Sequence, residues 1–475
     1  MLFPTIDFAI FFLLVFLGHW VLNHDRRAWS AFMIVASYVF YGWWDWRYVF
    51  LLAGVSAVSQ LAAIMVARQD EQRRRMQVMA IGVAATIAPL LYFKYYGFVT
   101  VNAANTANAL GINWVPPLIQ VILPVGVSFY TFMAISYVVD VYRRDFEVSG
   151  WSDLFLYLSF FPHLVAGPIV RPDELIPQFE HRQDARHVDI VGAGWLILGG
   201  LFKKVVIANT LSAAIVDPVF GDPSRQSAVD ALGGLIAYAV VIYCDFSGYT
   251  DIAIGVAKLL GFEFPQNFDR PYSARSIQEF WRRWHMTLSR WLRDYLYIPL
   301  GGNRKGPVRT YVNLMLTMVL GGLWHGAAWH FVVWGGLHGI YLAIGHWKTG
   351  MRATGRLAEP PSSAPVIVVQ TVTTFALVCI GWAFFRADSV ATALDLLGRI
   401  LHGWSTPTEL LTAQVLLWTA VGLATQFLPH APAEWLRARL RGWQVVPLGV
   451  AAALFLFVLT TLGPRGVAPF IYFQF

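Results

Sequence analysis

The chain is 475 residues long and strongly apolar: 57% of its residues are hydrophobic, and only 13% carry a charge. The mean hydropathy is +0.54. A soluble domain carries about a quarter charged residues because its surface must be hydrated, so this composition excludes a soluble globular protein. The net charge of +7 is compatible with nucleic-acid binding. However, the basic residues lie in short loops between apolar runs, where membrane topology explains them. We therefore expect an integral membrane protein that binds no nucleic acid.

Twelve apolar runs are long enough to cross a bilayer, which takes roughly 20 helical residues. They predict a single all-α, polytopic membrane domain over residues 1–475, in contact with membrane lipids. The N-terminal Met-Leu-Phe-Pro-Thr lacks the basic region and cleavage site of a signal peptide, so we expect a retained first span. The predicted spans are 3–23, 28–44, 47–67, 77–100, 116–140, 188–216, 227–260, 312–330, 331–348, 364–386, 409–428 and 444–463.

The orientation of these spans follows from the loops that carry arginine. Basic loops at 26–27, 68–75 and 143–144 alternate with nearly uncharged loops at 44–46 and 101–115. Lysine and arginine are enriched in the cytoplasmic loops of membrane proteins. With twelve crossings, this pattern places the basic loops in the cytoplasm and both termini outside.

Two segments differ from ordinary spans. Residues 151–170 are apolar, contain Pro162 and Pro168, and have basic loops on both sides, which predicts a re-entrant element. Residues 274–299 keep apolar side chains at helical spacing with arginines between them, which predicts a cytoplasmic amphipathic helix in the membrane interface. An anchor that only holds a loop against lipid headgroups is the alternative for this helix, but His285 lies within it.

His325 is the leading candidate for chemistry. It lies in the predicted span 312–330, and ionisable side chains in spans are costly and usually functional. A neutral imidazole can take a proton from a hydroxyl or thiol and return it to a leaving group. Gly321, Gly322 and Gly326 would let a substrate or another backbone approach closely. A buried histidine that hydrogen-bonds across helices remains the alternative.

Four other histidines compete with His325. If the helix that carries His285 folds inward, the two imidazoles form a pair, one catalytic and one orienting. His330 and His338 are expected to cap or bridge helices. His163 is expected to line a cavity or to pack in the interior.

The predicted span 227–260 contains Asp245 and Asp251, together with Ser247 and Tyr249. Two acids in one span indicate a polar interior with Arg or His partners on neighbouring helices. Structural pairing is the favoured interpretation. A proton path is the alternative, and it would favour a transporter.

The sequence contains no pattern for a metal or for a serine nucleophile. Cys244 and Cys379 lie within apolar runs and form neither a metal-binding motif nor a disulfide framework. No Gly-x-Ser-x-Gly elbow is present. We expect no bound metal or cofactor, and direct group transfer with histidine as the base is simpler than a covalent intermediate on serine.

Five segments of the sequence, in order along the chain, resemble the membrane-bound O-acyltransferase family, and within it the bacterial branch of alginate O-acetyltransferase membrane subunits. A lone Trp-His-Gly triplet would be weak evidence, whereas the ordered set is specific. The segments are PVGVSFYTF at 124–132, FPHLVAGPIVRP at 161–172, YCDFSGYTDIAIG at 243–255, the long run at 267–306 and GGLWHGAAWHFVVWGGLHG at 321–339.

This resemblance implies a ring of spans around a tunnel that narrows near the catalytic histidine. His325 matches the histidine regarded as catalytic, and His285 matches the second characteristic histidine. Trp324, Gly326, Trp284, Arg282 and Arg283 are the expected substrate-binding residues. The two arginines would meet an anionic donor, although lipid headgroups would suit them equally well.

The resemblance also implies acetyl transfer across the inner membrane of a bacterium for O-acetylation of an exported polysaccharide such as alginate, with both termini periplasmic. The donor would be acetyl-CoA or another acyl carrier. The expected partners are a periplasmic or membrane-anchored acetyltransferase and the complex that synthesises and exports the polymer. The alternatives are a transporter that moves an acyl carrier or a proton without making bonds, and an acyltransferase for a lipid or a protein.

Overall fold

A computed structural model describes residues 1, 3–116, 122–182, 184–429, 431–463 and 470. These residues form helices joined by turns and loops, with no β-strand among them, so the predicted all-α fold class is confirmed. The chain divides into two compact units. Unit 1 comprises Met1–Ile190 and Ala253–Pro265, and unit 2 comprises Val191–Ile252 and Gln266–Phe475.

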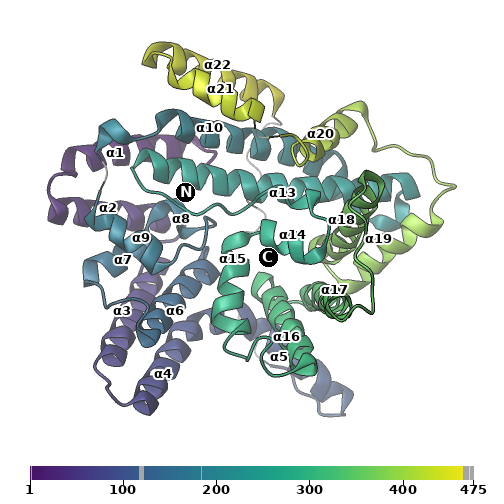
Figure 1. Cartoon of the computed structure of the whole chain (residues 1–475), viewed down its shortest axis with the longest axis horizontal. Helices are drawn as coiled ribbons and strands as arrows, with labels where there is room; N and C mark the ends of the chain where they lie inside the picture. The colour runs from purple at the N-terminus through teal and green to yellow at the C-terminus, as the bar shows by residue number, and fades with distance from the viewer. Residues whose placement is uncertain (2, 117–121, 183, 430, 464–469, 471–475) are drawn as a thin grey trace. The chain divides into compact units, whose positions relative to one another are not determined.

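In unit 1, the helices α3, α4 and α6 pack side by side (Figure 1). Gly82 allows a close approach of α4 to α3, because a Cβ atom there would lie 2.5 Å from the Cβ of Ala62. The helices are α1 (Ile6–Leu22), α2 (Arg26–Gly42), α3 (Arg47–Ala67), α4 (Gln72–Leu90), the π-helical η1 (Leu91–Tyr95), α5 (Tyr96–Ala109), α6 (Val127–Arg143), α7 (Trp151–Ser159), α8 (Phe161–Leu164), α9 (Pro172–Glu180) and the short 3₁₀ turn η2 (Ala185–His187).

Unit 2 contains the remaining helices, several of which include wider π-helical turns. The helices are α10 (Ile190–Leu201), π-helical η3 (Phe202–Ala208), α11 (Asn209–Leu211), π-helical η4 (Ser212–Val216), α12 (Asp217–Gly221), 3₁₀ η5 (Pro223–Arg225), α13 (Ala228–Leu259, whose last turns belong to unit 1), 3₁₀ η6 (Pro271–Ser273), α14 (Ile277–Arg283), α15 (Met286–Leu292), π-helical η7 (Arg293–Tyr297), α16 (Pro307–His325), α17 (Trp329–Ala353), α18 (Ala364–Arg386), α19 (Val390–His402), α20 (Ala413–Ala424), α21 (Ala431–Arg441) and α22 (Val445–Leu462).

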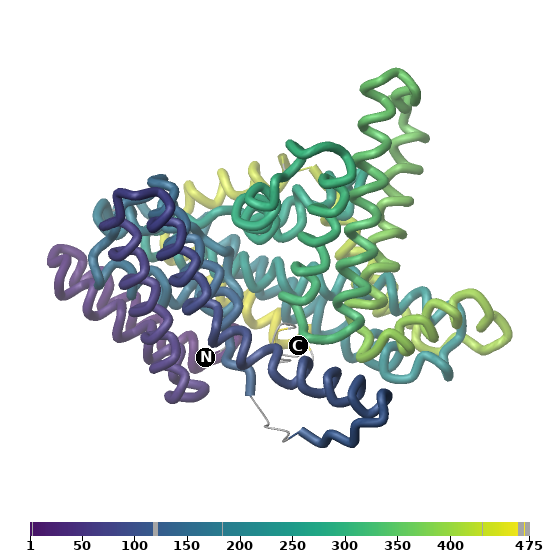
Figure 2. Tube along the Cα trace, turned by 90° about the horizontal axis from the view of Figure 1, so that it is seen from below, coloured from purple at the N-terminus to yellow at the C-terminus, as the bar shows by residue number. Residues whose placement is uncertain are grey.

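The helices α17 and α18 form a long antiparallel hairpin in unit 2. Figure 2 shows the two helices, in green, running side by side to a common tip. The tip is formed by the segment between Ala353 and Ala364. The hairpin brings the end of α18 back to the start of α17, where several of the predicted site residues lie.

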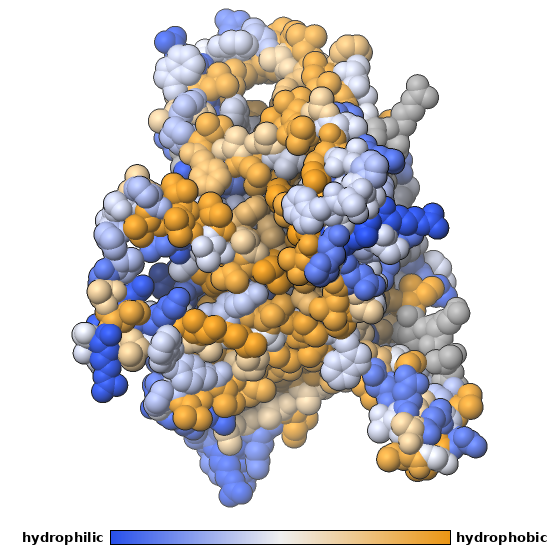
Figure 3. Space-filling model, turned by 90° about the vertical axis from the view of Figure 1, so that its right-hand side faces the viewer, coloured by the Kyte–Doolittle hydropathy of each residue, from blue (hydrophilic) through white to orange (hydrophobic). Residues whose placement is uncertain are grey.

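Six helices or continuous helical runs in the described part of the chain are long and apolar enough to cross a membrane. Figure 3 shows a face of the molecule on which apolar residues cover a broad area. Such a surface is stable in lipid and not in water, so the protein is a multi-pass membrane protein. Twelve crossings and a ring around a tunnel remain predictions. The six helices or helical runs that are long and apolar enough to cross a membrane are Arg47–Ala67, Gln72–Ala109, Ile190–Gly221, Ala228–Leu259, Ala364–Arg386 and Val445–Leu462.

The predicted span boundaries are wrong in three places. The helix predicted at 77–100 runs from Gln72 to Ala109, so most of the expected loop 101–115 is helical. In the span predicted at 116–140, residues 117–121 lie outside the described residues and α6 begins only at Val127, after Gly126 in a left-handed conformation (φ 74°). The spans predicted at 312–330 and 331–348 meet at 326–328, not after residue 330.

Within unit 2, α10 and α13 touch through their backbones. A Cβ atom on Gly200 would lie 2.5 Å from the carbonyl oxygen of Gly248, and one on Gly248 would lie 2.7 Å from the carbonyl oxygen of Gly200. Neither position has room for a methyl group. Small residues of this kind let helices in membranes approach closely.

We therefore predict that Gly200→Ala destabilises the protein by about 1–3 kcal/mol, because the added methyl group overpacks the crossing. The measurement is the thermal unfolding midpoint in detergent. The matched control is Gly199→Ala, since a Cβ atom there has no atom within 4 Å. A Gly200→Ala midpoint equal to that of the control would contradict the close crossing.

Candidate active site

The packing of α16 on α17 places His325. A Cβ atom on Gly322 would lie 2.2 Å from the carbonyl oxygen of Phe331, and one on Gly335 would lie 2.4 Å from that of Met318. Gly322 therefore serves the approach of another backbone, one of the two alternatives expected from the sequence, and Gly335 does the same from the side of α17. The helix α16 ends at His325, because Gly326 takes an extended conformation (φ −160°) and the chain turns into α17.

His325 lies in an aromatic box. Its side chain is buried, and its ring centroid lies 5.0 Å from that of Trp324, 5.1 Å from Trp334 and 5.1 Å from Phe385. All three contacts are edge-to-face. Aromatic walls exclude water and leave the imidazole few routes for proton exchange. This is a suitable environment for a proton-transferring group.

The segment 274–299 is not the single amphipathic helix predicted. It forms α14, α15 and η7, and the helix is interrupted between α14 and α15. The break arises because Trp284 is extended and His285 is left-handed, with φ 41° and ψ 56°. Left-handed backbone is unfavourable for a residue with a side chain. The buried apolar residues of segment 274–299, among them Phe280 and Leu288, pack against other parts of the protein.

His285 is fully buried beside Asn267. Its Nδ1 lies 3.1 Å from the Asn267 side-chain oxygen Oδ1. The ring of Phe246 meets the imidazole edge-on at 4.7 Å between centroids. Burial lowers the pKa of His285 to about 3, so the imidazole is neutral at physiological pH. A neutral imidazole is the form that accepts a proton.

Trp324 connects the two histidines. Its ring centroid lies 6.2 Å from that of His285 and 5.0 Å from that of His325. The two imidazoles are therefore separated by no more than the sum of these distances. Both imidazoles thus lie against the ring of Trp324, and the pairing of His285 with His325 expected from the sequence remains a prediction.

The other predicted substrate-binding residues lie in different surroundings. Trp284 is buried against Trp382, with 4.9 Å between ring centroids. The ring of Phe331 fills the position of a Cβ atom on Gly326. Arg283 forms an ion pair with Glu279 at 2.7 Å. Arg282 is exposed, so it is the better placed of the two arginines to meet an anion. Their roles in binding substrate remain predictions.

Three other histidines bridge structural elements. His330 lies in the first turn of α17, instead of sharing a helix with His325, and its Nδ1 lies 3.0 Å from the carbonyl oxygen of Phe384 in α18. His338 accepts a hydrogen bond of 3.3 Å from the indole N–H of Trp281. In unit 1, His163 bonds the carbonyl oxygen of Tyr157 at 2.9 Å. These contacts fit the bridging and packing roles expected from the sequence.

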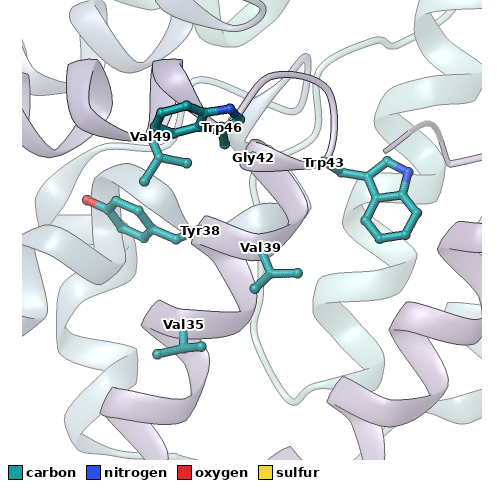
Figure 4. A pocket seen from close by; sticks show the side chains of 7 residues that line it. All are labelled: Val35, Tyr38, Val39, Gly42, Trp43, Trp46 and Val49. Carbon is teal, nitrogen blue, oxygen red and sulfur yellow. The ribbon is translucent and has the colours of Figure 1, made fainter.

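An open apolar groove lies in unit 1, away from these residues in the sequence. Figure 4 shows its walls, which come from α2, the start of α3 and the turn between them. Its volume is about 460 Å³, and Trp43 and Trp46 are exposed at its edge. Exposed tryptophan is typical of the level of lipid headgroups. The groove contains none of the predicted site residues.

Comparisons with known proteins identify the family. Residues 141–384 match the sequence profile of MBOAT, the membrane-bound O-acyltransferase family. The chain is 41% identical to a protein named probable alginate O-acetylase from Pseudomonas aeruginosa, over 83% of this chain and 73% of that protein. A protein of the same name from Pseudomonas putida is 37% identical over the full length of both chains. A peptidoglycan O-acetyltransferase from Helicobacter pylori is 34% identical, over 84% and 79% of the two chains.

The chain belongs to the membrane-bound O-acyltransferase family. The match covers His285, His325 and the residues around them, so the site described above lies in the family's shared region. The protein is accordingly a membrane-embedded O-acyltransferase. The roles of its individual histidines rest on geometry.

Two lysines, which were not predicted from the sequence, are the partners of Asp245 and Asp251. Lys204 pairs with Asp245, and both side chains are buried; Lys203 pairs with Asp251 and donates to Ser247 at 3.0 Å. Arg or His partners were expected from the sequence, and this expectation was wrong. The signal was present, because two adjacent lysines interrupt the apolar run 190–221. Their π-helical segment η3 could not be read from the sequence.

Lys204→Met should strongly destabilise the acyltransferase. It removes the ammonium from a buried carboxylate, and breaking a buried ion pair in this way costs about 3–5 kcal/mol. The double variant Lys204→Met/Asp245→Leu should recover most of that loss, because no charge is left in the interior. The measurement is the unfolding midpoint in detergent.

Lys203→Met is the matched comparison, since the Lys203 and Asp251 side chains are 17% and 27% exposed, against 4% and 5% for Lys204 and Asp245. It should cost less than Lys204→Met. An equal or larger loss at Lys203 would show that burial does not set the strength of these pairs.

Proposed function

We propose that this acyltransferase passes acetyl groups across the bacterial inner membrane for O-acetylation of an exported polysaccharide. The observation that carries the proposal is the placement of His285 and His325 against the same tryptophan, within the region that matches the family. The names of the relatives supply the acetyl group and the polymer. Two of them are named probable alginate O-acetylases, and a third is named a peptidoglycan O-acetyltransferase.

His325 is the proposed general base. An acceptor hydroxyl oxygen attacks the acetyl carbonyl carbon while the imidazole takes the hydroxyl proton. The tetrahedral intermediate then collapses, the bond to the donor's leaving group breaks, and the imidazolium returns the proton to that group. The step needs no other reactant. The buried aromatic box keeps water from competing as the acceptor.

The donor proposed is acetyl-CoA or another acyl carrier that approaches from the cytoplasm. Both are anionic, and the exposed guanidinium of Arg282 is a suitable first contact. Arg283 holds Glu279 and also donates to the Ser273 hydroxyl at 3.0 Å. We propose that it shapes the segment around α14 more than it binds donor.

The partners proposed are a periplasmic or membrane-anchored acetyltransferase, which places acetyl on the polymer, and the complex that synthesises and exports that polymer. A membrane subunit with its site in the interior needs an outward-facing acceptor of this kind to reach a large polysaccharide. Alginate is the leading candidate for the polymer, because two of the three relatives described are named for it.

We predict that His325→Ala lowers polymer acetylation by about 10²–10⁴-fold, the usual effect of losing a general base, with near-normal protein abundance. His285→Ala should also reduce acetylation severely and leave some activity if His285 orients. The measurement is the acetyl content of the exported polymer in cells, together with the amount of each variant in the membrane.

The control is His330→Ala, which breaks one hydrogen bond to Phe384 and should retain most activity. Activity that survives in His325→Ala but not in His330→Ala would show that the site is assigned to the wrong histidine. A transporter without bond making would tolerate His325→Ala as long as its path stayed open, so normal acetylation in that variant would favour the transporter.

The proposed orientation makes a separate prediction. A cysteine at Ile112, which is 60% exposed, should react with an impermeant thiol reagent added to spheroplasts, and a cysteine at Arg73 should not. The native Cys244 and Cys379 are both buried, so their background labelling should be low. Labelling at Arg73 alone would reverse the orientation and with it the side from which the donor arrives.

A further inference from the structure

We propose that Asn267 is a positioning residue of the reaction: it holds His285 as the tautomer that carries its proton on Nδ1, which leaves Nε2 as the basic nitrogen. The inference rests on the proposed acyl-transfer function and adds to it, because neither the sequence nor that proposal assigned a role to Asn267. It also gives His285 a defined hydrogen-bond acceptor atom, Nε2, while His325 remains the proposed general base.

The orientation of the Asn267 amide is fixed by Thr287. The backbone N–H of Thr287 lies 3.2 Å from the Asn267 Oδ1 atom, and the Thr287 hydroxyl lies 2.9 Å from the same atom. A backbone N–H can only donate. The atom that faces it must therefore be the amide oxygen and not the nitrogen.

The tautomer of His285 follows from this orientation. Its Nδ1 lies 3.1 Å from the same Oδ1 atom. Two acceptors cannot form a hydrogen bond, so Nδ1 must carry the proton. In a neutral imidazole the other nitrogen then holds the lone pair. Catalytic histidines commonly have a neighbouring group that selects the tautomer by hydrogen-bonding to the other ring nitrogen.

Asn267 also holds the strained backbone of His285. The N–H of Met286, which follows His285, donates to the Asn267 carbonyl oxygen at 2.9 Å. Together with the two contacts from Thr287, this bond pins the chain where φ is 41°. A left-handed backbone is strained for a non-glycine residue, and such residues cluster at active sites.

Stability alone does not explain an asparagine at this position. Its side chain is 1% exposed, and its amide nitrogen Nδ2 has no hydrogen-bond partner in the part of the chain that the structure describes. Leaving a buried donor unsatisfied destabilises the folded protein. The residue bears this cost while its oxygen serves three donors, which points to the oxygen as the functional atom.

The test compares two replacements of Asn267 in the full-length protein in membranes. Asn267→Leu keeps the volume and removes the acceptor, so kcat/KM for acetylation should fall by about 10²-fold, the lower range for lost proton transfer. Asn267→Asp keeps an acceptor oxygen and should retain activity near pH 8. Its carboxylate favours the imidazolium and should raise the pKa of His285 by roughly 1–3 units.

The pH profile separates positioning from a structural role. Because the neutral imidazole is the active form, activity is lost as the pH falls through the pKa of His285. In the plot of activity against pH, the acid limb of the Asn267→Asp variant should therefore lie at higher pH than the acid limb of the wild type. Thr287→Val is the matched control: it removes one donor to the same oxygen and should change stability without moving the limb.

A spectroscopic measurement makes the outcome independent of acetylation. In protein labelled with ¹⁵N-histidine, the signal lost in His285→Asn identifies His285, and it should show the Nδ1–H tautomer. The tautomer should change in Asn267→Leu. An unchanged tautomer in Asn267→Leu would overturn the inference. So would equal losses of kcat/KM in Asn267→Leu and Asn267→Asp, if the acid limb of the pH profile of Asn267→Asp did not move. Wild-type protein that transfers no acetyl but keeps this tautomer would overturn the proposed function instead.

Discussion

The close approach of α16 and α17 is the constraint on which the site depends. In lipid, helices gain little from apolar contact with one another, so their association rests on packing and hydrogen bonds. Gly322 and Gly335 let each backbone meet a carbonyl group of the other helix. A larger residue at either position would push α16 outward and carry His325, its last residue, away from Trp334. The glycines therefore fix the position of the histidine more than they open a route for substrate.

Several buried polar side chains of unit 2 are held by a second polar group: Lys204 by Asp245, His330 by a carbonyl oxygen, and His285 by Asn267. Water is scarce in such an interior, so a buried polar group that lacks a partner within the protein is costly. Proton transfer can then be confined to a few chosen atoms.

The sequence predicted the long helices well and the site only in part. Apolar runs of about 20 residues determine a span by themselves, and 47–67 and 364–386 agree with α3 and α18 to the residue. The break at His285 could not be predicted, because its left-handed backbone depends on contacts with Asn267, eighteen residues earlier in the chain. The pairing of Lys204 with Asp245 is likewise tertiary. His325 was found because a histidine within an apolar run is visible in the sequence alone.

The π-helical segment η3 has a consequence for how related chains are aligned. A π turn closes its hydrogen bonds one residue later than an α turn, so a helix that contains one holds an extra residue over the same rise. In a relative without that residue, every side chain beyond the segment would be rotated by about 100°. An alignment free of gaps would then match Lys204 to a residue on another face of the helix. The carboxylates of Asp245 and Asp251 provide the better landmarks, because α13 is an uninterrupted α-helix.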